Sequence, residues 1–326
     1  MKRASLKSIA AAAGVSKTTA SFVLNGKGDK HKINTATQQR ILEEAHRQNY
    51  QPSFLAQTLS SGKTMTIGLL LPKNESYLAT TLVHHLIPLL QSQQYRLLPG
   101  MAQPTAISER AIIDDYILRQ TDAIIAIQPI HKNEWESSLA VLQTPLVIID
   151  SQNERKSTGT LNNDFSHMIN LLIQHHFQHH KKAIGFIGRE RTNHAQLGAY
   201  LTCYIDRFDI SSPYHSLLKE AEPVANGIKA LLKLNVNALI FESPELAHEA
   251  LRYLQNNHLP NIENVGLSFL GWNPEFTLAH PKIVGVDFVP SQLAEEVNHL
   301  LTAALACQSV TQSVTNDKLY QLYPKM

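Results

Sequence analysis

The pattern that most constrains the fold is a series of short apolar runs that begins at Thr66. These runs cover 66–72, 95–100, 122–129, 145–150, 182–188, 237–243 and 265–272. They alternate with longer stretches of helical character, such as residues 78–92. Continuous apolar strands separated by helices are typical of βαβ units, in which helices cover a parallel sheet. The pattern predicts doubly wound parallel sheets, and its length favours two lobes over one.

Charge is distributed unevenly along the 326 residues. Residues 1–63 contain 10 Lys and Arg against 3 Asp and Glu, a net charge of +7, whereas the whole chain carries +2. A basic segment of this size favours contact with phosphates, because each neutralised phosphate releases condensed counterions. A solvated basic surface accounts for the charge equally well, so the choice depends on the pattern within the segment.

Three short helices are predicted within residues 5–48, in the segments SLKSIAAAAG, SKTTASFVLN and NTATQQRILEEAHRQNY. Ser5 is the expected N-cap of the first helix and Gly14 its terminator. Asn34 or Thr35 is expected to begin the third helix. Three helices in so few residues predict a small helical domain.

The second helix is predicted to have two different faces. The apolar face is expected to form a small core with the other two helices, through Ile9, Ala10, Val15, Ala20, Val23, Leu24, Ile41, Leu42 and Ala45. The opposite face carries Lys17, Thr18, Ser21 and Phe22. A helix, a tight turn and a second helix with outward-facing residues near its N-terminus form a helix-turn-helix, which reads DNA in the major groove. Hydroxyl groups suit this role because they bond phosphates and bases.

Two segments carry a specific resemblance. SLKSIAAAAGVSKTTASFVLNGKG resembles the N-terminal signature of the lactose repressor family of bacterial transcription regulators, and NYQPSFLAQTLSSGKTMTIGLLLP resembles the hinge helix of that family and its first core strand. The order of strands and helices continues the resemblance to about residue 320. The KTTASFVLNGK core and the loop GKGDKHKIN are most similar to the fructose and sucrose repressor branch.

The resemblance implies a small all-α helix-turn-helix head and an α/β body of two doubly wound parallel-sheet lobes, like that of the periplasmic binding proteins. The head is expected to cover 1–50, a hinge helix or linker 51–63, and an effector-binding and dimerisation domain 64–326. Within that domain, the N-lobe is expected at about 64–160 plus 290–320, and the C-lobe at about 161–289.

The resemblance also implies which residues contact DNA. Base-reading positions are occupied by Lys17, Thr18 and Phe22, and positions that hold phosphates or the groove edge by Ser16, Thr19, Ser21 and Asn25. Most family members have Arg at the position of Phe22, where it reads guanine through two hydrogen bonds. Phe22 is therefore expected to favour thymine methyl groups or a simple fit of shape.

Further DNA contacts are expected outside the second helix. Lys27, Lys30 and Lys32 lie in a basic loop that contacts DNA or is merely solvated. Ala56 and Leu59 match hinge residues that enter the minor groove, where Leu59 would act as a wedge between base steps. Two hinges are needed for this, so the resemblance implies a homodimer or homotetramer on a near-palindromic double-stranded operator.

The resemblance places a small-molecule effector, a sugar or sugar derivative, in the cleft between the lobes. Asp150 and Asp164 match acidic cleft positions, and Asn74 and Tyr77 lie where first-lobe contacts are usual. Three usual polar contacts are replaced, because Gln196, Ser243 and Trp272 stand where relatives have Arg, an Asn-Asp pair and Asp. Loss of the Arg fork disfavours a phosphorylated sugar. Trp272 either stacks on a sugar face or fills the pocket.

These observations predict a cytoplasmic regulator of transcription, a repressor of a carbohydrate-utilisation operon, which needs no cofactor. Two cysteines are too few for a disulfide framework. The sequence contains no uninterrupted run of about 18 apolar residues, so no membrane span is expected. The apolar stretch IAAAAG is too short for the core of a signal peptide. A two-lobe sugar-binding protein without a DNA role is the alternative, but it would need an export signal and no basic head.

Other readings of the sequence carry less weight. None of the motifs G-x-S-x-G, Walker A, G-x-G-x-x-G or H-E-x-x-H occurs, so an enzyme is not expected. The segment HHFQHH at 175–180 is interpreted as a solvent-facing histidine cluster rather than a metal site. The helix at 78–92 is either a dimer-interface helix or a core helix.

Overall fold

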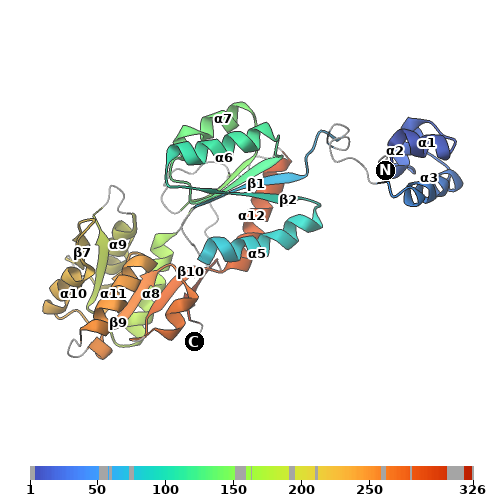
Figure 1. Ribbon diagram of the computed structural model, residues 1–326. Helices are drawn as coiled ribbons and strands as arrows, with labels where there is room; N and C mark the ends of the chain where they lie inside the picture. The colour runs from blue at the N-terminus through green and yellow to red at the C-terminus, as the bar shows by residue number, and fades with distance from the viewer. Residues whose placement is uncertain are drawn as a thin grey trace. The chain divides into compact units, whose positions relative to one another are not determined.

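The computed structural model describes most of the chain, which forms two compact units, Met1–Thr64 and Met65–Met326. The described residues are 4–50, 58, 61–72, 77–150, 159–162, 164–190, 195–209, 212–257, 262–279, 281–306 and 319–324. We call the first unit the head and the second the body, and each is coloured by residue number in Figure 1.

The head contains three helices, α1 (Leu6–Ala12), α2 (Lys17–Leu24) and α3 (Thr35–Arg47). Each begins at a polar N-cap whose side chain accepts a hydrogen bond from the backbone three residues later: Ser5, Ser16 and Asn34. Because each cap satisfies a backbone N–H that the helix leaves unpaired, these residues fix where the helices begin. The N-cap prediction at Ser5 is confirmed, and of the two candidates for the start of the third helix the N-cap is Asn34.

The core of the head is made of small and branched apolar side chains. Its buried members are Ile9, Ala10, Ala13, Ala20, Val23, Ile41 and Ala45, with Val15 and Leu24 packed against them. The prediction that Leu42 faces inward is wrong, since its side chain is 51% exposed. Ile41 and Ala45 lie on one stripe because they are four residues apart, whereas Leu42 is turned about 100° away from Ile41 around the helix.

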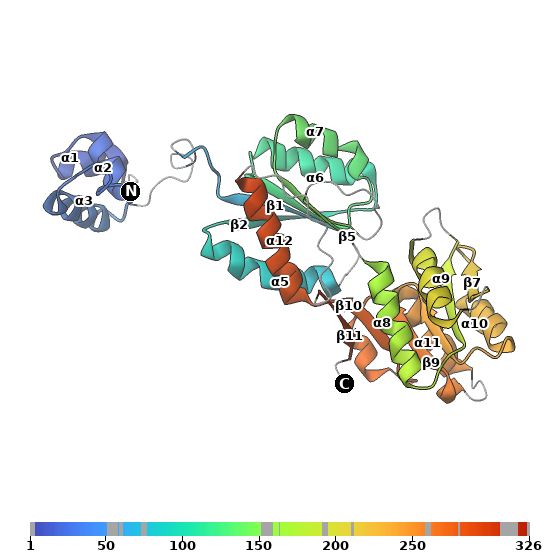
Figure 2. The same cartoon turned by 180° about the vertical axis from the view of Figure 1, so that it is seen from behind.

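The first sheet of the body has five parallel strands in the order β2-β1-β3-β4-β5. The strands are β1 (Thr66–Pro72), β2 (Arg96–Ala102), β3 (Ala123–Ile127), β4 (Leu146–Asp150) and β5 (Thr160–Asn162). Its helices are α5 (Tyr77–Ser92), α6 (Ala106–Leu118), α7 (Glu136–Val141) and, from late in the chain, α12 (Pro290–Leu305), which packs along α5 (Figure 2).

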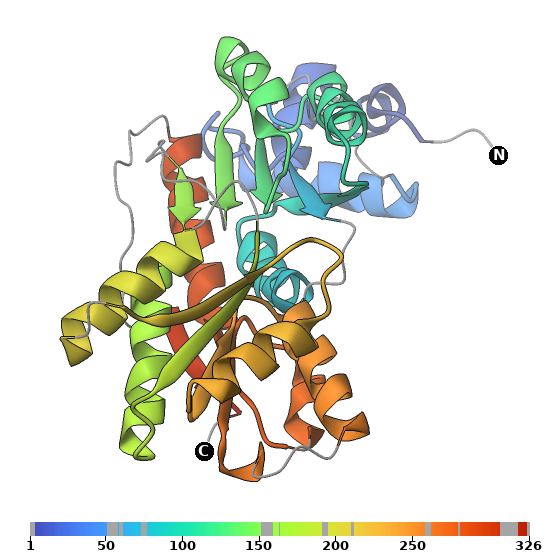
Figure 3. The same cartoon turned by 90° about the vertical axis from the view of Figure 1, so that its left-hand side faces the viewer.

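The second sheet has six strands in the order β11-β10-β9-β8-β6-β7, with β11 antiparallel to β10 and the other pairs parallel. The strands are β6 (Ile184–Arg189), β7 (Tyr214–Leu218), β8 (Ala238–Phe241), β9 (Gly266–Leu270), β10 (Val284–Phe288) and β11 (Tyr320–Tyr323). The helices are α8 (Phe165–Gln178), α9 (Ala195–Phe208), α10 (Val224–Lys233) and α11 (Pro244–Asn256). Figure 3 shows α8 beside α9 and α10 beside α11.

Sequence runs and observed strands agree in part. All seven predicted runs contain a strand, and the expected fold class of a helical head with an α/β body of two parallel-sheet lobes is confirmed. Four strands, β5, β7, β10 and β11, were not among the runs. Residues of β7 and β11 are mostly only partly buried, so the continuous apolar signal of a central parallel strand is weak there.

Within the body, the chain crosses from one sheet to the other more than once. After β5 the chain enters α8, which packs on β9 and β10. After β10 it enters α12, which packs on α5 and β4, and β11 then lies again in the second sheet. The two sheets are therefore joined by several segments that are far apart in sequence.

Candidate DNA interface and effector site

The N-terminal half of α2 is an exposed polar surface on the head. Ser16 Oγ accepts a hydrogen bond from Thr19 N at 3.0 Å and lies 2.8 Å from Thr19 Oγ1, so both hydroxyls belong to the cap. Lys17 and Thr18 are exposed, and Ser21 is half-buried. Ala20 and Val23 are buried on the opposite side. This arrangement leaves a cation, several hydroxyls and the positive end of the helix dipole together, which suits contact with an anion.

The end of α2 continues into the basic loop. Asn25 Nδ2 donates to Ser21 Oγ at 3.3 Å, so these two predicted contact residues lie side by side. The ring of Phe22 stacks on the ring of His31, with 3.5 Å between centroids and 11° between planes. Nothing in the local sequence pattern pointed to this pair, because the two residues belong to a helix and a loop.

The other predicted contact residues of the head fall into two groups. Lys27, Lys30 and Lys32 are exposed in the loop between α2 and α3. Ala56 and Leu59, the predicted minor-groove residues, lie outside the described residues.

The predicted effector residues are spread over both sheets of the body. Asn74 lies outside the described residues, and so does the side chain of Asp150, whose backbone ends β4. Tyr77 begins α5 and packs against the apolar cluster that contains Trp272. Gln196 lies in the first turn of α9 and is half-buried.

Two of the predicted effector residues act as helix caps. Asp164 Oδ1 accepts a hydrogen bond from His167 N at 2.9 Å, and its own N–H donates to Tyr320 Oη at 2.8 Å. Ser243 Oγ accepts a hydrogen bond from Leu246 N at 3.4 Å, at the start of α11. These caps hold the beginnings of α8 and α11, and each side chain is at least partly engaged within the protein.

The ring of Trp272 is packed inside the body. It is 6% exposed and stacks on Tyr323 with 5.3 Å between centroids, and it also lies against Phe269 and Phe276. The ring therefore belongs to the apolar core of the second sheet. Its backbone N–H donates to Asp287 Oδ2 at 3.0 Å.

Asp287 is a buried carboxyl group on β10 that the sequence did not single out. Its Oδ1 accepts a hydrogen bond from Phe288 N at 2.7 Å, and Oδ2 accepts one from Trp272 N. Burial raises the pKa of Asp287 to about 7, against the opposing effect of the two backbone donors. The group therefore holds its proton in the folded protein up to about neutral pH.

This pKa predicts a pH-dependent stability. In the unfolded chain Asp287 loses its proton near the ordinary aspartate pKa of 3.8, so its stabilising contribution is complete below that pH and is lost as pH rises through about 7. Between these limits the free energy of unfolding should fall by up to about 1.4 kcal/mol per pH unit. In Asp287→Asn this component should vanish. Denaturant unfolding of both proteins from pH 4 to 8 tests it, and identical slopes would contradict it.

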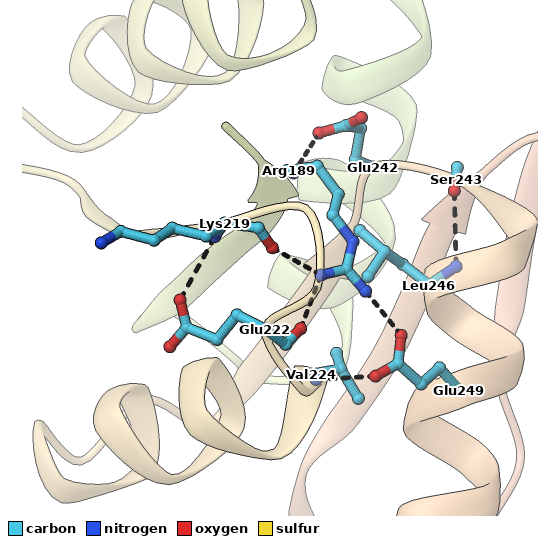
Figure 4. A network of polar contacts seen from close by, with 8 residues as sticks. All are labelled: Arg189, Lys219, Glu222, Val224, Glu242, Ser243, Leu246 and Glu249. Atoms are coloured by element: carbon cyan, nitrogen blue, oxygen red, sulfur yellow. Dashed lines mark hydrogen bonds and ion pairs between the residues drawn. The ribbon is translucent and has the colours of Figure 1, made fainter. Parts of the chain in front are cut away.

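A polar network at the carboxyl end of β6 is centred on Arg189 (Figure 4). The guanidinium Nη2 pairs with Glu249 Oε2 at 2.8 Å, and Nη1 donates to the carbonyl oxygens of Lys219 at 2.9 Å and Glu222 at 2.5 Å. The backbone N–H of Arg189 donates to Glu242 Oε2 at 2.7 Å. The guanidinium is thus committed to partners from α11 and from the loop between β7 and α10.

Sequence reasoning missed this network although one signal was present. Arg189 directly follows the run that forms β6, and in parallel sheets the residues after a strand face the ligand edge. The acidic partner of Arg189 could not be identified from the sequence, because Glu249 lies 60 residues further along the chain.

A hollow lies at the carboxyl ends of β1, β2 and β3. Pro72, Gln103, Gln128 and Glu109 are among its lining residues. Glu109 is 3% exposed and accepts hydrogen bonds from Ile130 N, His131 N and Trp135 Nε1 at 2.7 to 3.0 Å. None of the described residues among the predicted effector contacts lines this hollow, which has room for about one water molecule.

The histidine cluster differs from its prediction. His175 and His176 are buried, so the expectation of a solvent-facing cluster is wrong for them. His176 Nε2 lies 2.7 Å from Ser268 Oγ, and burial lowers the pKa of His176 to about 3, so its ring is neutral. These positions face inward because α8 packs them against β9. Within the described ranges, no group of three or more His, Cys, Asp or Glu side chains is arranged to hold a metal ion.

Part of the chain is similar in sequence to known families and proteins. Residues 5–53 match the family described as "Bacterial regulatory proteins, lacI family". The chain is 35% identical over 149 residues to the sucrose operon repressor of Klebsiella pneumoniae, a match that covers 46% of this chain and 44% of the relative. It is 31% identical over 156 residues to the catabolite repressor/activator of Escherichia coli K12, covering 46% of each chain. The match thus spans less than half the length of these relatives, both of which bear names of regulators rather than of enzymes.

The fold comparison extends over nearly the whole chain. The crystal structure of the lac repressor dimer bound to operator and the anti-inducer ONPF superposes with a TM-score of 0.76 and 15% identity, covering 95% of this chain and 94% of the other. This likeness shows a shared fold. Over the described residues, no helix combines the length and apolar character that a bilayer crossing requires.

Proposed function

We propose, because residues 5–53 match the lacI family of bacterial regulatory proteins, that this chain is a sequence-specific DNA-binding regulator that represses an operon for carbohydrate use. The observation that carries the proposal is α2, whose apolar side lies in the core of the head while Lys17 and Thr18 are exposed on the other side. The net charge of the head supports the same partner, double-stranded DNA.

We further propose that the protein acts as a homodimer or homotetramer in the cytoplasm, on a near-palindromic operator. This proposal includes a DNA-binding domain of 1–50, a hinge of 51–63 and an effector-binding and dimerisation domain of 64–326, with Ala56 and Leu59 in the minor groove. The fold shared with a repressor dimer supports it. The alternative of a sugar-binding protein without a DNA role is not favoured, because it gives the basic head no purpose.

The body is proposed to bind a sugar or sugar derivative at the carboxyl ends of its parallel strands, where doubly wound sheets bind ligands. Binding would favour one arrangement of the two lobes and so change the affinity of the heads for DNA. Because Arg189 is engaged by Glu249 and by carbonyl oxygens, we expect an uncharged ligand rather than a phosphorylated one.

One experiment tests the function. The full chain is used to select duplexes from a random library, and the selected duplex is then titrated in the presence of sugars and sugar phosphates. We expect a near-palindromic consensus and a sugar that changes the affinity for it. Failure to enrich any sequence would overturn the DNA proposal, and enrichment with no response to any compound would overturn the effector proposal.

A further inference from the structure

The stack between Phe22 and His31 joins the predicted recognition helix to the basic loop that follows it. The ring centroids are 3.5 Å apart and the planes are nearly parallel, at 11°. Phe22 lies in α2, on the side away from the buried Ala20 and Val23, whereas His31 lies in the loop before α3. One face of the Phe22 ring is therefore covered by a loop side chain and is not available to DNA.

The loop has a defined structure of its own. The N–H of Lys27 donates to the carbonyl of Phe22 at 2.7 Å, and the N–H of Ile33 donates to the carbonyl of Gly28 at 3.0 Å. Gly28 approaches Gln38 of α3 so closely that a Cβ at this position would lie 2.4 Å from Oε1. The loop is thus held at both ends, by α2 on one side and by α3 on the other.

The exposed lysines of the loop form a cationic surface. Its acidic residue, Asp29, accepts a hydrogen bond from Gln38 Nε2 at 2.8 Å, and the same amide also donates to the Ile33 carbonyl at 2.8 Å. Lys27, Lys30 and Lys32 are exposed, and none of the three forms an ion pair with another residue in the described part of the chain. Three exposed ammonium groups on a loop next to α2 can each neutralise a backbone phosphate.

We propose that Phe22 is a positioning residue: its ring holds His31, and thereby the loop of residues 27–32, beside α2 so that the loop lysines bind backbone phosphates of the operator. This inference rests on the proposed function. It assigns Phe22 a role different from the reading of thymine methyl groups, and it makes the basic loop a second contact surface of the head rather than a solvated segment.

The proposal is tested with the full chain and the duplex that the native protein selects. Phe22→Ala, His31→Ala and the double variant are compared at several salt concentrations, and each is also subjected to a new selection. Both single variants should bind the selected duplex and an unrelated duplex more weakly by the same factor. The slope of log K against log salt should become shallower by about 0.9 for each phosphate contact that is lost.

The coupling between the two rings gives a second readout. If the rings act as one unit, the double variant should bind the selected duplex no more weakly than the weaker-binding single variant does. Phe22→Tyr keeps the stack and should bind the duplex like the native protein. Leu42→Ala, which truncates an exposed apolar side chain on α3, is the matched control and should have no effect.

Three results would overturn the proposal. The first is that Phe22→Ala changes the base preference at one position of each half-site and leaves the salt slope unchanged, because Phe22 would then read a base directly. The second is full additivity of the two single variants. The third is weak binding by Phe22→Tyr in a head that still melts at the native temperature. If the native protein itself selects no sequence, the proposed function has failed rather than this inference.

Discussion

Removal of residues 1–64 is expected to abolish specific DNA binding completely and to leave residues 65–326 folded. The head and the body are separate compact units, and the buried core of the head consists of head residues alone. The body keeps its own clusters under both sheets, which contain no residue of the head. Gel-shift titration with the selected duplex and thermal unfolding of the truncated chain test both halves of the prediction. Specific binding by the truncated chain would contradict it.

A point substitution in the full chain supplies the matched control for this truncation. Ile41 is fully buried in the core of the head, so Ile41→Asp places an unpaired carboxylate in an apolar site and should unfold the head. DNA binding should be lost as in the truncated chain, while the body melts at its native temperature. The exposed neighbour Leu42 offers the comparison, since Leu42→Asp should leave the head folded.

Arg189→Met is expected to lower the free energy of unfolding of the body by about 2 to 4 kcal/mol. The substitution removes the hydrogen bonds to the carbonyl oxygens of Lys219 and Glu222 and the ion pair with Glu249. The Arg189 side chain is only 15% exposed, so water has little access to the Lys219 and Glu222 carbonyl oxygens that it bonds. The loss should stay below the largest values known for buried pairs, because Glu249 is 40% exposed and can be hydrated.

The same helix provides the control for this substitution. Arg252 is exposed on α11 and forms no ion pair with another residue among those described. Arg252→Met should therefore change the free energy of unfolding by no more than about 0.5 kcal/mol. Denaturant unfolding of the truncated body measures both variants in one transition. Equal losses in the two would show that the network around Arg189 does not stabilise the fold.

The separation of α2 into a polar and an apolar face could be predicted from the sequence, whereas the hydrogen bonds made by the residues named as effector contacts could not. Ser16 caps α2, and the polar and apolar positions of that helix separate as the helical period requires. In the body, Asp164 and Ser243 were selected as ligand contacts, yet their oxygens accept backbone hydrogen bonds at helix starts. An Asp or Ser after a strand is equally suited to both roles, so sequence position alone does not separate them.

Contacts between distant segments explain what sequence reasoning missed. His176 was expected in solvent, but it is paired with Ser268, which is 92 residues further along the chain. Asp287 and Trp272 meet because β10 lies beside β9 and β11 in the sheet. Such partners follow from the strand order, which the sequence pattern does not specify.

The helices and strands of this protein follow from local sequence, through the caps at Ser5, Ser16 and Asn34, the apolar stripes of the head and the alternation that forms two sheets. These features depend on residues within a few positions of one another, so local hydrogen bonding and periodicity suffice. Which groups are buried and which are paired depends on the packing of distant segments, as in the stack of Phe22 on His31 and the ion pair of Arg189 with Glu249. Those outcomes depend on which surfaces meet when the chain folds, and burial then sets the charge that each group carries.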